Sequence, residues 1–109
     1  MKSRVLVTGA NGQLGKTIRG LSSDFTNSID FVFVDKSELD ITNSESLIFF
    51  FKASHFDYCI NCAAYTNVDL AETETEKAIN INANAVKNLA INCKNQDIIL
   101  VSNTHIMLP

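Results

Sequence analysis

Three glycines spaced three residues apart, Gly9, Gly12 and Gly15, follow the apolar run 5–7 near the start of the chain. Glycine has no Cβ, so a turn built from glycines lets a ligand approach the backbone N–H groups closely. The apolar run is typical of a buried parallel strand, and apolar residues recur with helical spacing from Leu14 onward. A strand, a glycine turn and a helix N-terminus together favour binding of a diphosphate, because unpaired amides and the helix dipole both attract negative charge.

The spacing is Gly-x-x-Gly-x-x-Gly rather than Gly-x-Gly-x-x-Gly, and three glycines alone are a weak signal. The alternative is a plain strand-to-helix turn that required small residues. The flanking strand and helix patterns favour dinucleotide binding over that alternative. The residues then expected to contact the dinucleotide here are Gly9, Asn11, Gly12, Gln13, Leu14 and Gly15.

An acidic residue, Asp35, follows the second apolar run and lies 20 positions beyond Gly15. In a dinucleotide-binding sheet, an acid at this position accepts hydrogen bonds from the adenosine ribose hydroxyls. A carboxylate accepts two bonds from a 2′,3′-diol but repels a 2′-phosphate, and Lys36 could offset that repulsion. The sequence therefore leaves NADH and NADPH both open. It also leaves Asp35 the alternative role of a solvated loop acid.

The rest of the chain alternates strand and helix patterns, which predicts an α/β fold with right-handed crossovers. Residues 42–45 have the form of a capping box with Thr42 as the cap, and a long helix is expected over 75–94. The apolar runs predict strands at 5–7, 31–34, 39–41, 58–62 and 98–101. We expect a Rossmann-like doubly wound parallel sheet of about five strands in order 3-2-1-4-5, forming one NAD(P)-binding domain over 1–109. The dinucleotide would lie across the switch point between the first and fourth strands, near Ala63, Ala64, Tyr65 and Thr66.

Composition restricts the function classes. The 109 residues carry a net charge of −3, with 46% hydrophobic and 19% charged residues, as in an ordinary globular domain. Such a chain lacks the basic footprint of a nucleic-acid-binding protein. No apolar run approaches the ~20 residues of a membrane span. The N-terminus opens directly into a strand pattern with no signal sequence, so we expect a cytoplasmic protein.

Cys59 and Cys62 form a C-x-x-C pair, which suggests either a redox dithiol or half of a zinc site. Both lie in the predicted strand 58–62, where residues three apart point to opposite faces of the sheet. No second pair has zinc spacing. We expect free thiols, no metal site, and no catalytic residue in this chain.

Three segments of the chain resemble dTDP-4-dehydrorhamnose reductases, which belong to the extended short-chain dehydrogenase/reductase superfamily. Residues 5–15 and 34–42 resemble the N-terminal half of that family. Residues 63–72 read Ala-Ala-Tyr-Thr-x-Val-Asp-x-Ala-Glu, a signature distinctive of it. The resemblance covers about residues 4–102.

The resemblance implies reduction of the 4-keto group of dTDP-4-dehydro-L-rhamnose with NADPH or NADH, giving dTDP-L-rhamnose for polysaccharide biosynthesis. It also implies a homodimer, with Mg2+ at some interfaces, although no residue here assigns a metal site. The contacts implied are Gly12, Gln13 and Leu14 at the pyrophosphate, Asp35 at the adenosine ribose, Asp40 and Ile41 at the adenine side, and Ala64, Tyr65 and Thr66 near the ribose and nicotinamide.

The end of the chain departs from the family pattern. Asn103 stands where the family has its catalytic Thr, and Thr104 follows one residue late. The Tyr-x-x-x-Lys pair that supplies a proton to the developing alkoxide is absent, as is the nucleotide-sugar domain. We therefore expect the cofactor-binding part of a reductase, truncated before the substrate domain and inactive alone. The alternative is a non-catalytic dinucleotide-binding regulatory or interaction module. In either case, the last strand and the Phe-rich helices would be left partly uncovered, so we expect the chain to self-associate.

Overall fold

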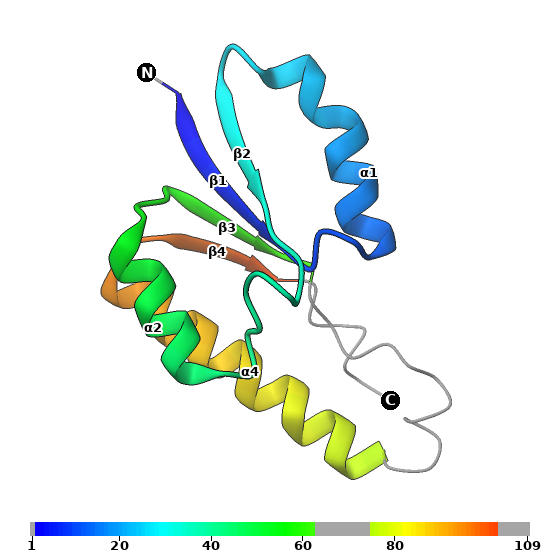
Figure 1. The fold of residues 1–109 in the computed structure, drawn as a ribbon, viewed down its shortest axis with the longest axis vertical. Coiled ribbons are helices and arrows are strands. Elements are labelled where there is room, and N and C mark those ends of the chain that lie inside the picture. The colour runs from blue at the N-terminus through cyan, green and yellow to red at the C-terminus, as the bar shows by residue number, and fades with distance from the viewer. Residues whose placement is uncertain (1, 63–74, 103–109) are drawn as a thin grey trace.

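The described part of the chain contains four parallel strands in one sheet, in the order β2-β1-β3-β4 (Figure 1). This computed structural model describes residues 2–62 and 75–102, without the side chains of 75–82 and 102. The strands are β1 (Ser3–Thr8), β2 (Ile29–Phe33), β3 (Tyr58–Asn61) and β4 (Ile99–Ser102). The helical elements are α1 (Gln13–Ser22), the short 3-10 helix η1 (Ser23–Phe25), α2 (Ser44–Ala53) and α4 (Thr75–Asn95).

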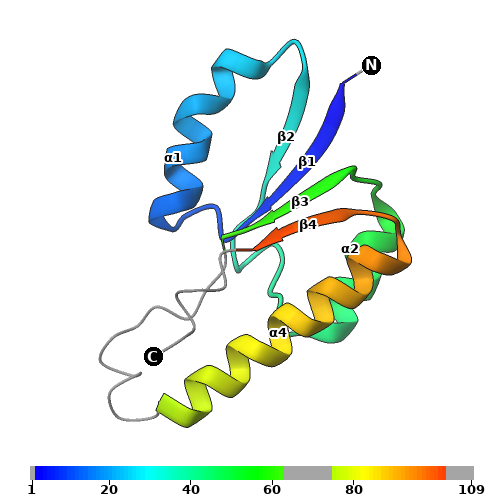
Figure 2. The same cartoon turned by 180° about the vertical axis from the view of Figure 1, so that it is seen from behind.

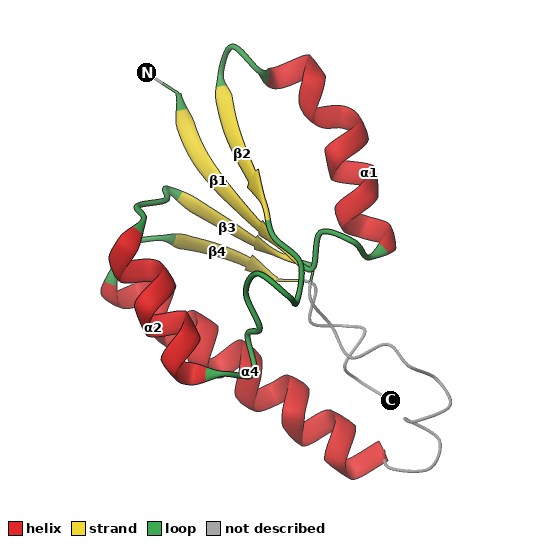
Figure 3. Cartoon of the chain, viewed as in Figure 1, coloured by secondary structure: helices red, strands yellow, loops and turns green. Residues whose placement is uncertain are grey.

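The helices lie on both faces of the sheet. Helix α1 lies on one face, and α2 and α4 pack side by side on the other (Figures 1 and 2). Colouring by secondary structure shows the same layers, with the strands' carboxyl ends converging on the loop before α1 (Figure 3). This is the doubly wound parallel arrangement expected from the alternating patterns, and it confirms the predicted fold class. No helix in the described residues is long and apolar enough to cross a bilayer.

One predicted strand is wrong. Residues 39–41 form no strand, so the observed order matches the predicted 3-2-1-4-5 without its third strand. Leu39 and Ile41 are both buried, which explains the strand-like alternation in the sequence. Their backbone instead belongs to turns, in which the Leu39 N–H donates to the Asp35 carbonyl and the Asn43 N–H donates to the Asp40 carbonyl.

The N-terminal cap of α2 lies one residue later than predicted. The Asn43 side chain accepts a hydrogen bond from the Ser46 N–H at 3.1 Å, so Asn43, and not Thr42, caps the helix. Thr42 instead donates its hydroxyl to the Asp40 carboxylate. The helix buries Phe51 in the core and leaves Phe49 on the opposite side, 76% exposed. Leu6 of β1, Leu47 of α2, Leu89 of α4 and their neighbours make that core.

The face of the sheet that carries α1 is only partly covered. Strand pairing aligns two apolar rows across all four strands: Phe31, Val5, Tyr58 and Ile99, and then Phe33, Val7, Ile60 and Val101. Val7 of β1 is fully buried, whereas Ile99 and Val101 of β4 are 58% and 53% exposed. We call Tyr58, Ile60, Ile99 and Val101 the bare half-face, since no described helix covers them (Figures 1 and 2).

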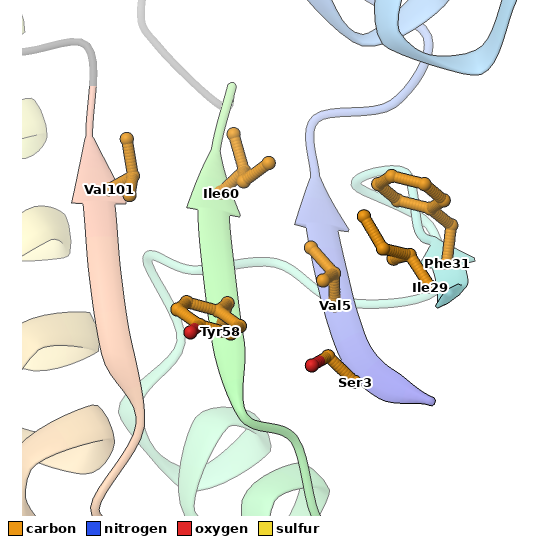
Figure 4. A pocket seen from close by; sticks show the side chains of 7 residues that line it. All are labelled: Ser3, Val5, Ile29, Phe31, Tyr58, Ile60 and Val101. Carbon is orange, nitrogen blue, oxygen red and sulfur yellow. The ribbon is translucent and has the colours of Figure 1, made fainter. Parts of the chain in front are cut away.

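A hollow of about 380 Å³ lies over this face and extends from β2 to β4 (Figure 4). Its lining is apolar apart from Ser3 and the Tyr58 hydroxyl. Leu14 and Leu21 of α1, two of the apolar residues that recur with helical spacing, are 41% and 55% exposed. Parallel sheets are normally covered on both faces, so this apolar surface is suited to contact with further protein.

Candidate dinucleotide-binding site

The turn between β1 and α1 presents a helix N-terminus at the carboxyl end of the sheet. Gly9 has φ 63°, a left-handed conformation that favours glycine. The Gly12 N–H donates to the Gly9 carbonyl at 3.0 Å, and the Ala10 N–H donates to the Val34 carbonyl at the end of β2. The first bond closes the turn on itself, and the second ties it to the end of β2.

Gly12 is the N-terminal cap residue of α1, and its carbonyl accepts the first helical bond from the Lys16 N–H at 2.9 Å. No side chain caps this end, and the first turn contains no acidic residue. The amides of Gln13, Leu14 and Gly15 belong to the first turn, where an α-helix has no internal acceptor for them. Amides and dipole together make this end a suitable site for a diphosphate.

The glycines of the turn have different structural roles. A Cβ placed on Gly15 would lie 2.6 Å from the Ala10 Cα and carbonyl oxygen, so Gly15 allows α1 to pack against the turn. A Cβ on Gly12 would have the Gly9 carbonyl oxygen as its nearest neighbour, at 3.3 Å. A side chain at Gly12 would thus have one tight contact, which a small shift relieves, whereas the packing of the protein itself requires glycine at position 15.

Asp35 follows β2, and hydrogen bonds hold its carboxylate in one orientation. Its Oδ1 accepts from the Ser37 hydroxyl, the Ser37 N–H and the Glu38 N–H. Its Oδ2 accepts from the Asn11 side-chain amide at 2.9 Å, which links the acid to the glycine turn. The predicted pyrophosphate residues and the predicted ribose acid therefore lie together in the structure. The Asn11–Asp35 contact had no separate signal in the sequence.

The Ser37 hydroxyl, followed by the Glu38, Ser37 and Asn11 donors, lowers the pKa of Asp35 below its ordinary value of 3.8. A carboxyl whose pKa is lower in the folded state stabilises the fold above its unfolded pKa and loses that contribution as the pH falls through the folded value. Asp35 is therefore fully charged at neutral pH.

We expect urea unfolding below about pH 4 to reveal this effect. The free energy of unfolding of the natural chain should fall more steeply with acid than that of Asp35→Asn, which cannot lose a carboxylate at this site. Asp24→Asn, at an exposed acid of η1, is the matched control and should follow the natural chain. Identical acid profiles for all three proteins would contradict the role of the Asp35 hydrogen bonds.

Asp40 and Ile41 occupy the turn that follows. The Asp40 Oδ1 accepts from the Thr42 hydroxyl and N–H, and the Thr42 hydroxyl is the main cause of its lowered pKa, with a further contribution from the charge of Lys36. The Ile41 side chain is buried in the core next to Leu39 and Val34. The structure thus places Ile41 near the expected site but directs its side chain inward.

The carboxyl ends of β1 and β3 lie side by side at the predicted switch point. Thr8 pairs with Asn61, both are buried, and the Thr8 hydroxyl donates to the side-chain oxygen Oδ1 of Asn61 at 2.7 Å. The Cys62 N–H donates to the Thr8 carbonyl. This buried pair was not among the predicted site residues, although each of its polar residues ends an apolar strand, which is a signal visible in the sequence. Ala63, Ala64, Tyr65, Thr66 and the altered segment from Asn103 lie outside the described residues.

The C-x-x-C pair does not form a dithiol site. Cys59 is buried, and a hydrogen bond with Cys93 of α4, together with burial, raises the pKa of its thiol. Cys62 follows the end of β3, and burial raises its pKa too. All three cysteines are free thiols. The described residues contain no cluster of three or more potential metal-binding His, Cys, Asp or Glu side chains.

A chain with this fold and this sequence matches a known protein family. Residues 2–105 match the family described as RmlD substrate binding domain. The chain belongs to this family. The resemblance to dTDP-4-dehydrorhamnose reductases is thereby confirmed, and the match covers nearly the whole sequence.

Relatives of this RmlD-family chain include dTDP-4-dehydrorhamnose reductases from several bacteria. The protein from Aggregatibacter actinomycetemcomitans is 40% identical over 88 residues, covering 81% of this chain and 30% of the relative. The protein from Mycolicibacterium smegmatis is 36% identical over 93 residues, covering 85% and 27%. The crystal structure of the reductase from Bacillus anthracis in complex with NADP superposes with a TM-score of 0.81 at 39% identity, covering 92% of this chain and 35% of that one. The RmlD-family chain thus spans about a third of the length of these relatives.

Proposed function

We propose that this chain supplies the NAD(P)H-binding part of a dTDP-4-dehydrorhamnose reductase, which reduces dTDP-4-dehydro-L-rhamnose to dTDP-L-rhamnose in the cytoplasm. The observation that carries the proposal is the uncapped N-terminus of α1 lying beside the oriented Asp35 carboxylate, joined by the Asn11 side chain. Relatives named as dTDP-4-dehydrorhamnose reductases, one of them solved with NADP, support it.

Each part of the site has a separate role in this proposal. The amides of Gln13 and Leu14 bind the pyrophosphate, and Gly12 keeps the space beside them open. Asp35 accepts hydrogen bonds from the adenosine ribose, while Asp40 and the backbone of Ile41 border the adenine. The residues proposed for the nicotinamide side are Ala63, Ala64, Tyr65 and Thr66. The bound cofactor supplies a hydride.

The proposal assigns the chain a binding role without turnover of its own. Reduction of a ketone needs a proton donor aligned with the developing alkoxide, and the sequence contains no Tyr-x-x-x-Lys pair. The second candidate is a dinucleotide-binding regulatory or interaction module. A reductase activity assay on dTDP-4-dehydro-L-rhamnose distinguishes the two. Turnover that appears only when the remaining part of a reductase is added supports the first, and its absence under that condition favours the second.

The cofactor claim is tested by calorimetric titration of the chain with NADH and NADPH. We expect saturable binding of at least one of them, with a Kd between about 1 µM and 1 mM, the range in which enzymes commonly bind substrates. Absence of binding by both nucleotides at about 1 mM would overturn the proposed function.

We also propose that the chain self-associates through the bare half-face, with a second copy as the occupant. Its apolar side chains are continuous with β4, the edge strand of the sheet formed by the described residues, and an edge strand can pair with another chain. Sedimentation should therefore show a concentration-dependent dimer. Val101→Lys should weaken it, whereas Phe49→Lys, at an exposed apolar residue on the opposite side of the fold, should not. A monomer at every concentration would contradict this proposal.

A further inference from the structure

The glycine turn contains a dipeptide with reactive chemistry of its own. Asn11 precedes Gly12, and it is the only asparagine in the chain that is followed by a glycine. Asparagine is one of the thermolabile residues of proteins, because its side-chain amide reacts with the backbone nitrogen of the next residue. Glycine has no Cβ to obstruct that nitrogen, so an Asn-Gly pair reacts readily. Both residues are exposed, so water has access to them.

The reaction is a deamidation, and it needs only the atoms of this dipeptide and water. The Gly12 backbone nitrogen gives up its proton to hydroxide and forms a bond to the side-chain carbon Cγ of Asn11. The bond from Cγ to Nδ2 breaks, and this nitrogen takes up a proton from water and leaves as ammonia. Water then opens the cyclic imide at one of its two carbonyl carbons. The product at position 11 is aspartate or isoaspartate, with no change of oxidation state.

In the folded turn, hydrogen bonds occupy both reacting nitrogens. The Gly12 N–H, which has to lose its proton, donates to the Gly9 carbonyl at 3.0 Å. The Asn11 Nδ2, which has to leave, donates to the Asp35 Oδ2 at 2.9 Å. The Asp35 carboxylate is itself held by three donors from the turn that follows it. Attack on Cγ requires the Asn11 side chain to rotate away from Asp35, so the fold slows the reaction.

The product changes the charge at the proposed diphosphate site. A carboxylate replaces a neutral amide one residue before Gly12, the N-terminal cap residue of α1. This charge is attracted to the free amides of the first helical turn, and it repels a diphosphate that would bind them. It also replaces the donor to Asp35 with a second acceptor, so the hydrogen bond between the two residues is lost. Isoaspartate, in addition, lengthens the backbone of the turn by one methylene group.

We propose that the Asn11–Gly12 bond is a deamidation site which the folded turn protects, and that its modification abolishes dinucleotide binding. The part of this proposal that concerns binding rests on the proposed function. The part that concerns protection depends only on the turn and on Asp35. A molecule whose turn opens for long enough to react therefore loses the binding site permanently, even after the chain has refolded.

Protection is tested by incubating the full chain in mildly alkaline buffer, either folded or unfolded in urea, and measuring aspartate and isoaspartate at position 11 by peptide mapping with mass spectrometry. We expect the folded chain to react at least about tenfold more slowly, because a hydrogen bond to a charged group has to break first. Asp35→Ala removes the acceptor and should make the folded chain react about tenfold faster. Asp24→Ala, at an exposed acid of η1, is the matched control and should leave the rate unchanged.

Equal rates in the folded and unfolded natural chain would overturn the protection. Absence of any product at Asn11 in urea would overturn the deamidation site itself. An unchanged rate in a folded Asp35→Ala would overturn the role of its carboxylate. If circular dichroism shows that Asp35→Ala is unfolded, the ratio of the two rates in the natural chain decides the protection.

The effect on binding is tested by calorimetric titration with NADH and NADPH. Asn11→Asp reproduces the charge of one product, and Asn11→Gln is the matched variant that keeps a neutral amide. We expect Asn11→Asp to bind at least about tenfold more weakly than Asn11→Gln, with a smaller difference at high salt. Equal affinities would overturn the loss of binding and leave the proposed function standing. Binding of neither nucleotide by the natural chain would overturn the proposed function, and the deamidation rates would still decide the protection.

Discussion

Gly15→Ala should destabilise the fold by about 3 kcal/mol, the upper part of the range for overpacking a close contact. The added Cβ would lie 2.6 Å from the Ala10 Cα and 2.8 Å from its carbonyl carbon. Backbone atoms cannot rotate aside as a side chain can, so α1 would have to move away from the turn. In a domain of this size such a loss lowers the midpoint of thermal unfolding by about 15 °C, as measured by circular dichroism.

The control for this prediction is Gly20→Ala in the same helix. A Cβ on Gly20 would meet nothing within 4 Å, and alanine is the better helix former. This variant should be more stable than the natural chain by about 0.5 to 1 kcal/mol. Equal stability of Gly15→Ala and Gly20→Ala would show that the turn and helix are not packed as described.

Gly12→Val should weaken binding of NADH and NADPH by at least about 100-fold, because the side chain would fill the space beside the amides and prevent two charge-assisted hydrogen bonds, each worth about 1.5 to 3 kcal/mol. The fold should tolerate the change far better than at Gly15. Gly12 has φ −73° and ψ 173°, an extended conformation that valine adopts readily. A Cβ there would meet only the Gly9 oxygen, at 3.3 Å.

Calorimetry and thermal unfolding on the same samples separate binding from stability. Gly20→Val is the matched control, since it places the same side chain in α1 at a position with open space around it. It should bind as the natural chain does. Unchanged affinity in Gly12→Val would show that the pyrophosphate does not bind at this turn. Unfolding of that variant would show that the packing of the turn also requires glycine at position 12.

The strand–glycine–helix unit and Asp35 were predictable because each rests on local chemistry. Glycine spacing, an apolar run and an acid at a fixed offset all have short-range physical causes. The prediction of a strand at 39–41 was wrong because it, too, used only a local pattern. Alternation of buried and exposed residues reports burial, whereas a strand requires a hydrogen-bonded neighbour, which the local sequence does not encode.

The exposed face of α1 marks a second limit of sequence reasoning. The spacing of Leu14 and Leu21 correctly indicated a helix and an apolar side, but it could not indicate what that side would meet. The Asn11–Asp35 hydrogen bond joins residues 24 positions apart and depends on how the turn packs against β2. Contacts of this kind arise from tertiary packing, so they become visible only in the structure.

The side chains on the α1 face of the sheet become more exposed from β1 to β4, and this gradient affects the order in which the protein unfolds and folds. β1 is hydrogen-bonded on both sides and its Val7 is fully buried, while β4 pairs only with β3 among the described strands and has two residues more than half exposed. Local opening should therefore begin at β4 and leave β1, with its glycine turn, until last. During synthesis β1 and its glycine turn also emerge before β4, so the turn can fold while the β4 edge of the sheet is still to be added.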